Sequence, residues 1–535
     1  MRQLNFFFGG RGRPALCAAY GATIAAFLWI CGNFYLPNRG FTYLVEFGSK
    51  GEARYIPELR SIPHYDQPDS YGYDGQYYAQ IAMRPQLGSP DLLRAVDNLP
   101  YRARRILFCW TAWALAGGDP GRALAIFSVE NLAAWLLLAA LLLRWFPPLN
   151  WGNWARWAGV LASIGLCVSL RSALMDGPSL LVIAAGMAFL ETGRPWLAAA
   201  VFGVSGLGRE TNLLAGAALV PGGGKRGLSW LRALGQWALV LIPLAAWIAF
   251  VTARLGGGGV AGARNFAPPF AGYWGKCLEI ARFFSAGPAR LAVGMALVQV
   301  ALTTQLLFLV LRPRWSDPWW RLGAAYAALL AVLGSAVWEG YPGAVSRVVL
   351  PMLLAFNILV PRGRRWWIVL LLGNLSFIAS PTVLSPPPGE SFLCTVPAVL
   401  RAEVGTEPVG VAFGAAWYPE ERSWLEWWRW TGGDAALVLR NSRPQALGVS
   451  VGFGLRSKDR RTVEICDAAG RIVWEGILQP GILRSVAIPS VNLPPGDTPW
   501  RFVTDQPPIR QSPQDPRSVA FSLRNLRIDV NGVRP

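Results

Sequence analysis

The sequence contains few residues of the kinds that build metal centres and disulfide frameworks. Its 535 residues include one histidine, His64, and 7 cysteines, none of them in a Cys-x-x-Cys pair. A single histidine excludes a histidine-rich metal cluster and argues against a Ser-His-Asp triad. The cysteines fall mostly inside or beside apolar runs, so we expect neither a thiolate metal site nor a disulfide framework.

Charged residues are scarce too. They make up 15% of the chain, whereas hydrophobic residues make up 53%. A soluble domain carries about 25% charged residues. The hydrophobic residues gather in runs of roughly 20, the length that crosses a bilayer. The sequence therefore predicts a polytopic membrane protein, and its first run, residues 14–36, is too long for a signal-peptide core and predicts an uncleaved anchor.

The charge that is present is mostly positive, with 50 Lys and Arg against 31 Asp and Glu and a net charge of +19. Strongly basic proteins often bind nucleic acid. Here, however, the basic residues lie between apolar runs, which is typical of loops that orient membrane helices and touch anionic lipid. We therefore predict membrane lipid as a partner and no nucleic acid.

The apolar runs predict about eleven transmembrane helices within residues 1–384. The runs lie at residues 14–36, 123–143, 155–170, 180–190, 195–207, 212–221, 231–253, 291–311, 319–337, 345–360 and 366–384. Arginines precede the first run, so the positive-inside rule places the N-terminus in the cytoplasm and the long loop 37–121 outside. Residues 106–117 are apolar but short, and counting them as a span would put the basic loops outside, so we expect a helix on the outer membrane face.

The character of the chain changes at the linker Ser385-Pro386-Pro387-Pro388-Gly389. Short alternating runs separated by turn residues follow, and they predict an all-β sandwich over residues 385–535. An odd number of spans places this domain outside the membrane. Its tryptophan-rich stretch, residues 417–430, is suited either to carbohydrate contact or to packing in the sandwich core, and packing is favoured.

The loop 37–121 contains the stretch Tyr71-Gly72-Tyr73-Asp74-Gly75-Gln76-Tyr77-Tyr78. A general base needs a carboxylate that reaches an acceptor hydroxyl, and Asp74 is our candidate for that role. Its alternative role is a helix cap. The neighbours expected to contact substrate are Tyr73, Gln76 and Tyr77, and the lesser candidates for the base are Asp66, Asp69 and Asp97.

Arginines accompany this carboxylate. Arg102, Arg104 and Arg105 follow it in the same loop, and guanidinium groups bind phosphate in a bidentate fashion, although they also extend to lipid headgroups. Charges near membrane depth mark a functional site or a buried pair. The charges of this kind are Arg171 and Asp176 at the outer end of one span, Arg209 and Glu210 at a break between two short segments, and Arg347 just inside a later span. Arg209 and Glu210 are expected either to hold a lipid phosphate or to form a structural ion pair.

The glycine-rich segment 255–289 lies between two predicted spans. It predicts either a mobile loop that closes over a substrate or a simple connector.

The motif around Asp74, within residues 14–384, resembles bacterial polytopic glycosyltransferases of the GT-C class, in particular the cell-surface glycopolymer formation proteins with their Tyr-Asp-Gly-Gln-type motif. It is more distantly similar to the protein O-mannosyltransferases and the lipid A aminoarabinose transferases. The resemblance implies that Asp74 is the catalytic residue and that Arg171 and Asp176 match an Arg-x4-Asp-like pattern. Gly75 stands where an acidic residue is common in the O-mannosyltransferases, which leaves metal use open. The pattern from Trp417 to Gly433 resembles sandwich domains of some bacterial surface-polysaccharide enzymes.

The resemblance also implies an inverting glycosyltransferase of the bacterial inner membrane, with a GT-C-like domain at residues 1–384 and a periplasmic β-sandwich at residues 385–535. The donor would be a polyprenyl-phosphate sugar and the acceptor a glycan, a lipid or a protein. No metal-binding residue and no certain cofactor is predicted, while a role for a divalent metal stays open. The alternatives are a transporter or flippase of lipid-linked glycans and a non-catalytic scaffold in polysaccharide assembly.

Overall fold

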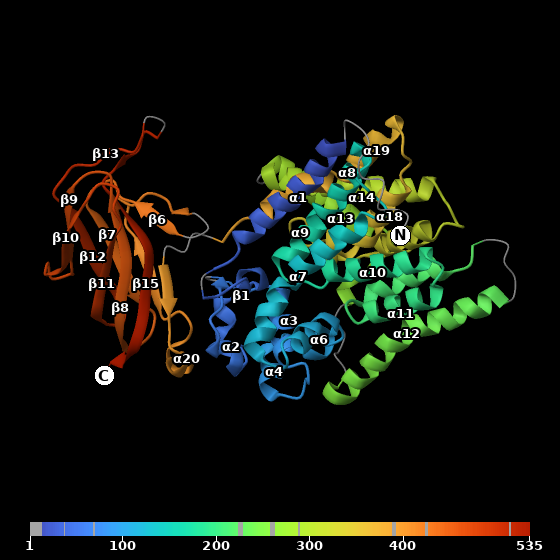
Figure 1. Cartoon of the computed structure of the whole chain (residues 1–535). Helices are drawn as coiled ribbons and strands as arrows, with labels where there is room; N and C mark the ends of the chain where they lie inside the picture. The colour runs from blue at the N-terminus through green and yellow to red at the C-terminus, as the bar shows by residue number, and fades with distance from the viewer. Residues whose placement is uncertain are drawn as a thin grey trace. The chain divides into compact units, whose positions relative to one another are not determined.

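The computed structural model describes residues 13–36, 38–67, 70–222, 228–256, 263–286, 289–387, 392–422, 426–512 and 515–534. The chain divides into two compact units (Figure 1). The first comprises Met1–Leu36, Gly40–Ile56 and Tyr65–Pro386 and is largely helical. The second comprises Pro37–Arg39, Pro57–His64 and Pro387–Pro535 and is largely built of strands.

Four helices in the described part of the chain are long and apolar enough to cross a membrane. They are α1 (Arg13–Gly32), α7 (Pro120–Leu142), α12 (Leu228–Leu255) and α14 (Ala289–Leu311). Only 17% of the apolar window of α12 is buried, as expected for a helix whose sides face lipid. These helices make the first unit a membrane domain.

The other predicted spans are shorter or interrupted. They correspond to α8 (Trp151–Leu161) with α9 (Ile164–Arg171), α10 (Asp176–Glu191), α11 (Pro195–Gly206), η4 (Glu210–Leu219), α15 (Pro318–Val332) with α16 (Ser335–Trp338), α17 (Val345–Val348) with α18 (Leu350–Leu359), and η6 (Arg364–Trp366) with α19 (Trp367–Gly373) and η7 (Leu375–Thr382). The prediction of about eleven spans is therefore not confirmed. The segment 255–289 also contains a helix, α13 (Ala271–Ala286), so it is more than a glycine-rich connector.

The long polar loop folds against the membrane helices. It contains η2 (Thr42–Val45), η3 (Ser49–Arg54), α3 (Asp74–Met83), α4 (Pro90–Ala95), α5 (Leu99–Arg102) and α6 (Leu107–Leu115), and β1 (Phe47–Gly48) pairs with β2 (Asp66–Gln67). Helices α3 and α6 pack on α7. With nine residues, α6 is too short to cross a bilayer. The N-terminus of α3 is thereby held close to the ends of the membrane helices.

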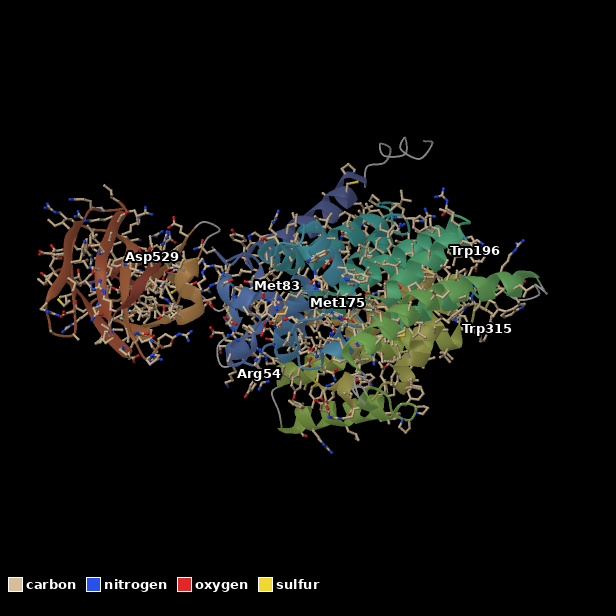
Figure 2. All side chains as sticks on the ribbon, turned by 90° about the horizontal axis from the view of Figure 1, so that it is seen from below. Arg54, Met83, Met175, Trp196, Trp315 and Asp529 are labelled. Atoms are coloured by element: carbon tan, nitrogen blue, oxygen red, sulfur yellow. The ribbon has the colours of Figure 1, made fainter. Side chains whose placement is uncertain are left out.

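Figure 2 labels two methionines inside the helical unit and two tryptophans at its edge. Met83, at the end of α3, and Met175, just before α10, are 2% and 3% exposed. Trp196 and Trp315 lie at the edge of the unit and are 51% and 70% exposed. Exposed indoles are typical of the membrane interface.

The second unit contains two larger sheets. One has the order β10 (Ile472–Leu478), β9 (Arg461–Cys466), β12 (Gly496–Thr504), β7 (Ala435–Asn441), β4 (Val409–Phe413). The other has the order β11 (Arg484–Leu493), β8 (Ala446–Ser457), β15 (Phe521–Arg534), β6 (Trp427–Trp430), β5 (Glu421–Arg422), and β3 (Phe392–Thr395) pairs in parallel with β15. Inward residues of both sheets share one apolar core, which gives the β-rich domain that the alternating runs predict.

The tryptophan-rich stretch contributes to that core. Trp417 is 7% exposed, and its ring meets those of Phe502 and Phe521 edge-on. Trp430 is 6% exposed. Packing therefore accounts for these two indoles, whereas Trp424 lies outside the described residues.

Candidate active site

Asp74 is the first residue of α3 and follows Tyr73 in an extended conformation. A carboxylate in the first turn of a helix is stabilised by the helix dipole. Its Oδ1 lies 2.9 Å from Nη2 of Arg102, which ends α5. The side chain of Asp74 is 31% exposed and that of Arg102 10%. The candidate base is therefore half-buried and accessible, in contact with a cation.

Arg102 joins several groups of the outer loop. It donates from Nε and Nη2 to the two carboxylate oxygens of Asp97, at 3.0 and 2.8 Å. Its guanidinium lies 5.1 Å from the ring centre of Tyr77. Among the described residues, Asp74 forms an ion pair with Arg102 alone and only through Oδ1. Its other oxygen is left for an acceptor hydroxyl.

A buried group of charges lies beside this pair. Asp176, at the start of α10, pairs with Arg209 and, at 3.2 Å, with Arg347. Arg347 also donates to the hydroxyl of Tyr73 at 2.9 Å. The Nε atoms of Arg209 and Arg347 are buried and have no hydrogen-bond partner among the residues described. The group thus retains donors for an anion next to Asp74.

Arg105 forms a third contact of this kind. It donates from Nε to Glu210 at 2.9 Å and from its two other nitrogens to the hydroxyls of Tyr78 and Tyr101. Of the two alternatives for Arg209 and Glu210, an ion pair between them is not formed, since Arg209 contacts Asp176 and Glu210 contacts Arg105. Neighbours in sequence at this helix break point to different partners.

Arg171 makes its contacts with the beginning of the outer loop. It pairs at 3.1 Å with Glu46 and lies 3.8 Å from the ring centre of Tyr43. The Arg171 and Asp176 of the motif therefore serve separate ion pairs. Glu46 is a residue that the sequence reasoning missed, because it is one acidic residue among several in the loop. It adopts the left-handed conformation at φ 59° and accepts a backbone hydrogen bond from Tyr73 at 2.9 Å.

The remaining candidate site residues make structural contacts around the Asp74 turn or lie apart from it. Gln76 is buried and donates to the carbonyl of Tyr71 at 2.7 Å, so it braces the turn before α3. Arg104 lies 5.9 Å from the ring centre of Tyr101 and has no carboxylate partner in the described ranges. Asp66 accepts from the hydroxyl of Tyr55 at 3.2 Å. Asp69 lies outside the described residues.

The glycine that follows Asp74 is required by close packing. A Cβ on Gly75 would lie 2.3 Å from the carbonyl oxygen of Ser172 and 2.7 Å from that of Val45. Both atoms belong to the backbone and cannot rotate away. The residue that departs from the O-mannosyltransferase pattern is thus the one that allows α3 to rest against the turn before α10.

Gly75→Ala should therefore destabilise the protein by at least ~2 kcal/mol, because the added methyl group would clash with backbone atoms that cannot move away without shifting a helix. Thermal unfolding of the full chain in detergent measures the effect. Gly21→Ala is the matched control, since a Cβ at this helical position meets nothing within 4 Å. Equal melting temperatures of Gly75→Ala and the unmodified protein would contradict the packing argument.

The charges around Asp74 determine its protonation. Burial favours the neutral acid, but the positive charges of Arg102, Arg347 and Arg105 outweigh burial and hold the pKa of Asp74 below its usual value. The carboxylate is therefore ionised at neutral pH. Glu46 differs, because burial raises its pKa in spite of Arg171.

The described residues contain no group of three or more His, Cys, Asp or Glu that could hold a metal ion. Asp74 and Asp97 share one cationic partner, since each gives an oxygen to Arg102. A cation binding between them would have to displace this guanidinium. The arrangement fits an anion better than a metal.

No family model matches the sequence, and no curated protein matches it. Among solved structures, the chain is similar to the cryo-EM structure of arabinosyltransferase EmbB from Mycobacterium smegmatis, with 11% identity and a TM-score of 0.36 over 99% of this chain. The alignment spans 66% of that chain. It is also similar to TmCBM61 in complex with beta-1,4-galactotriose, with 11% identity and a TM-score of 0.15 over 23% of this chain and 87% of that one. At these TM-scores neither likeness assigns a function to this chain.

Proposed function

We propose that this chain is a membrane glycosyltransferase. It transfers a sugar from a polyprenyl-phosphate donor to a hydroxyl of a glycan, a lipid or a protein, at the outer face of the bacterial cytoplasmic membrane, with the β domain in the periplasm. The observation that carries the proposal is the half-buried carboxylate of Asp74 beside arginines that retain buried donors. A base and an anion-binding group next to each other are what transfer from a phosphate-linked sugar requires.

The reaction balances on these residues. The acceptor oxygen forms a bond to the anomeric carbon, and the bond from that carbon to the phosphate oxygen breaks, with inversion. The acceptor proton passes to Asp74, and the polyprenyl phosphate leaves with the electron pair of the broken bond. Arg347 and Arg209 stabilise its negative charge, as preorganised donors do in other group transfers.

Donor binding also prepares the base. In the free protein the neighbouring arginines lower the basicity of Asp74. A phosphate bound to them neutralises part of their charge, so the pKa of the Asp74 carboxyl rises in the complex. The carboxylate becomes a better proton acceptor only when the donor is present.

An in vitro assay tests the proposal directly. The full chain in detergent is supplied with a polyprenyl-phosphate sugar and a mixture of acceptor glycans, and products are detected by mass spectrometry. Glycosidic product formed without a second compartment supports an enzyme. Donor translocation in vesicles without any product would favour the transporter, and neither result would favour the scaffold. The same assay with EDTA tests the proposed option of a divalent metal.

The pH dependence follows from the charges at Asp74. A carboxyl with a lowered pKa stays ionised even below its usual titration range, so the acid limb of kcat/KM for this group should lie at a lower pH than for an ordinary aspartate. Arg102→Gln removes the nearest charge while burial persists, so the limb should move to higher pH. A pH-rate profile of both proteins measures this shift, and an unmoved limb in Arg102→Gln would show that another group titrates.

A further inference from the structure

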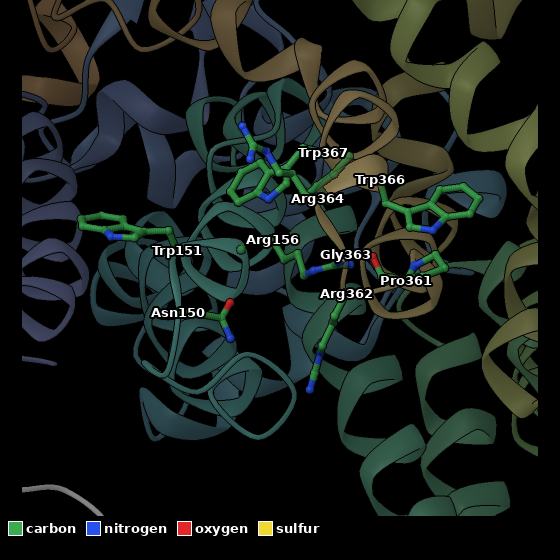
Figure 3. A pocket seen from close by; sticks show the side chains of 11 residues that line it. Asn150, Trp151, Arg156, Pro361, Arg362, Gly363, Arg364, Trp366 and Trp367 are labelled. Carbon is green, nitrogen blue, oxygen red and sulfur yellow. Dashed lines mark hydrogen bonds between the residues drawn. The ribbon is translucent and has the colours of Figure 1, made fainter. Parts of the chain in front are cut away.

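A hollow of about 710 Å³ opens in the helical unit away from Asp74. It is lined by Arg156, Arg362 and Arg364 together with Trp151, Trp366 and Trp367 (Figure 3). These residues come from the start of α8 and from the segment between α18 and α19. We call this hollow the arginine–tryptophan pocket.

The pocket is separate from the candidate active site. Helices α8 and α9 lead from Arg156 to Arg171, and α17 and α18 lead from Arg347 to the residues before Arg362. Each path runs through two successive helices, and the eleven residues of α8 alone rise by roughly 16 Å. Two independent chain paths therefore place the pocket at the opposite end of the bundle, where Asp74 does not reach.

The cations of the pocket lack counter-ions. Arg156 is 4% exposed and donates to the backbone carbonyls of Asn357 and Pro361, at 2.5 and 3.1 Å. Its Nε is buried and has no partner among the residues described. Arg362 donates to the carbonyl of Trp145 at 3.2 Å, and in the described ranges no carboxylate pairs with any of the three arginines. This contrasts with the Asp74 end, where acidic side chains pair with the arginines.

Such an arrangement favours a bound anion. A buried guanidinium without a carboxylate is costly, and a ligand phosphate that accepts several charge-assisted hydrogen bonds removes that cost. Guanidinium forks match phosphate oxygens in geometry. The shared chemistry of the ligand is therefore a phosphate group.

The aromatic residues indicate where that phosphate comes from. Trp151 is 52% exposed at the start of α8, and a further cation, Arg312, lies 4.9 Å from the ring centre of Trp366. Tryptophan is enriched at the level of lipid headgroups, and basic pockets between membrane helices bind anionic headgroups. A soluble anion has no apolar part that could contact these tryptophans, whereas a phospholipid does.

We propose that the arginine–tryptophan pocket binds the phosphate of an anionic phospholipid headgroup. The bound lipid would then contact α8 and the segment before α19. This site is independent of sugar transfer, because none of its residues lies among the charges around Asp74.

Native mass spectrometry of the full chain in detergent tests the site with phosphatidylglycerol and, in parallel, phosphatidylcholine. Phosphatidylglycerol should bind more tightly. Arg362→Gln and Arg364→Gln should each weaken it about fivefold, and together roughly 25-fold, as expected for arginines near anionic lipid. Both side chains are exposed, so their exchange should leave folding intact.

Arg365→Gln is the matched control, because it removes the same charge from an exposed neighbour that does not line the pocket. An equal loss in Arg365→Gln, or undiminished binding in the double variant, would overturn the site. Equal binding of the two lipids would do the same. A separate experiment adds 10 mM inorganic phosphate, a concentration above the dissociation constant expected for a weakly bound anion. Full displacement of the lipid by this phosphate would assign the pocket to a soluble anion instead.

Discussion

Asp74→Asn should reduce transfer by about 10³-fold or more, within the range that a general base contributes. The amide keeps the shape of the side chain and a hydrogen-bonding oxygen for Arg102, but it cannot accept the acceptor proton. Binding of the donor should change little, because the arginines that hold the phosphate remain. Single-turnover assays with saturating donor measure the loss in the chemical step.

The structure supplies a close control for this prediction. Asp97 also pairs with Arg102, at 2.8 Å, and is 42% exposed. Asp97→Asn removes the same type of ion pair from the same guanidinium but not the base, so transfer should stay within about tenfold, an effect typical of a rim ion pair. Equal losses in the two variants would mean that Asp74 acts only by holding Arg102, and the proposed base would have to be abandoned.

Arg347→Gln should lower transfer by at least ~100-fold, the effect of removing one donor to a developing negative charge. It should also destabilise the fold by about 1–3 kcal/mol, because the buried carboxylate of Asp176 loses one of its two partners and keeps only Arg209. Initial rates and thermal unfolding of the full chain measure the two effects. Arg347→Lys keeps the charge but not the planar fork, so it should recover stability better than activity.

Two further variants separate catalysis from folding. In Arg347→Gln the carboxylate of Asp176 keeps only Arg209 as a partner. Combining this variant with Asp176→Asn removes the half-compensated charge, so part of the stability should return while transfer stays low. Arg365→Gln is the control, since this exposed arginine lies neither among the charges around Asp74 nor in the lining of the arginine–tryptophan pocket. Activity that returns together with stability in the double variant would show that Arg347 is structural and not part of the phosphate site.

The candidate base and most of its cations could be predicted from the sequence because each signal is local. Asp74 stands in a long polar loop between apolar runs, and a charge next to an apolar run is visible in the sequence itself. Glu46 could not be predicted in this way. Its importance comes from its left-handed backbone and from its contact with Arg171, which is distant along the chain.

The number and continuity of the membrane helices could not be predicted well either. Residues 155–170 form one apolar run but two helices, since the chain breaks near Ser163, the residue before α9. The length of an apolar run shows whether a segment is long enough to cross the bilayer. It does not show where the helix is interrupted, because that depends on packing against neighbouring helices. The short segments around Arg209 show the same limit.

By itself the sequence determined that this protein has a helical membrane domain followed by a β domain, because run length and alternation are properties of neighbouring residues. Only the tertiary structure decided which charges meet. Arg347 reaches Tyr73 across 274 positions and Asp176 across 171, and Arg105 reaches Glu210 across 105. Any arginine attracts any carboxylate, so the choice of partner depends on which helix ends packing brings together.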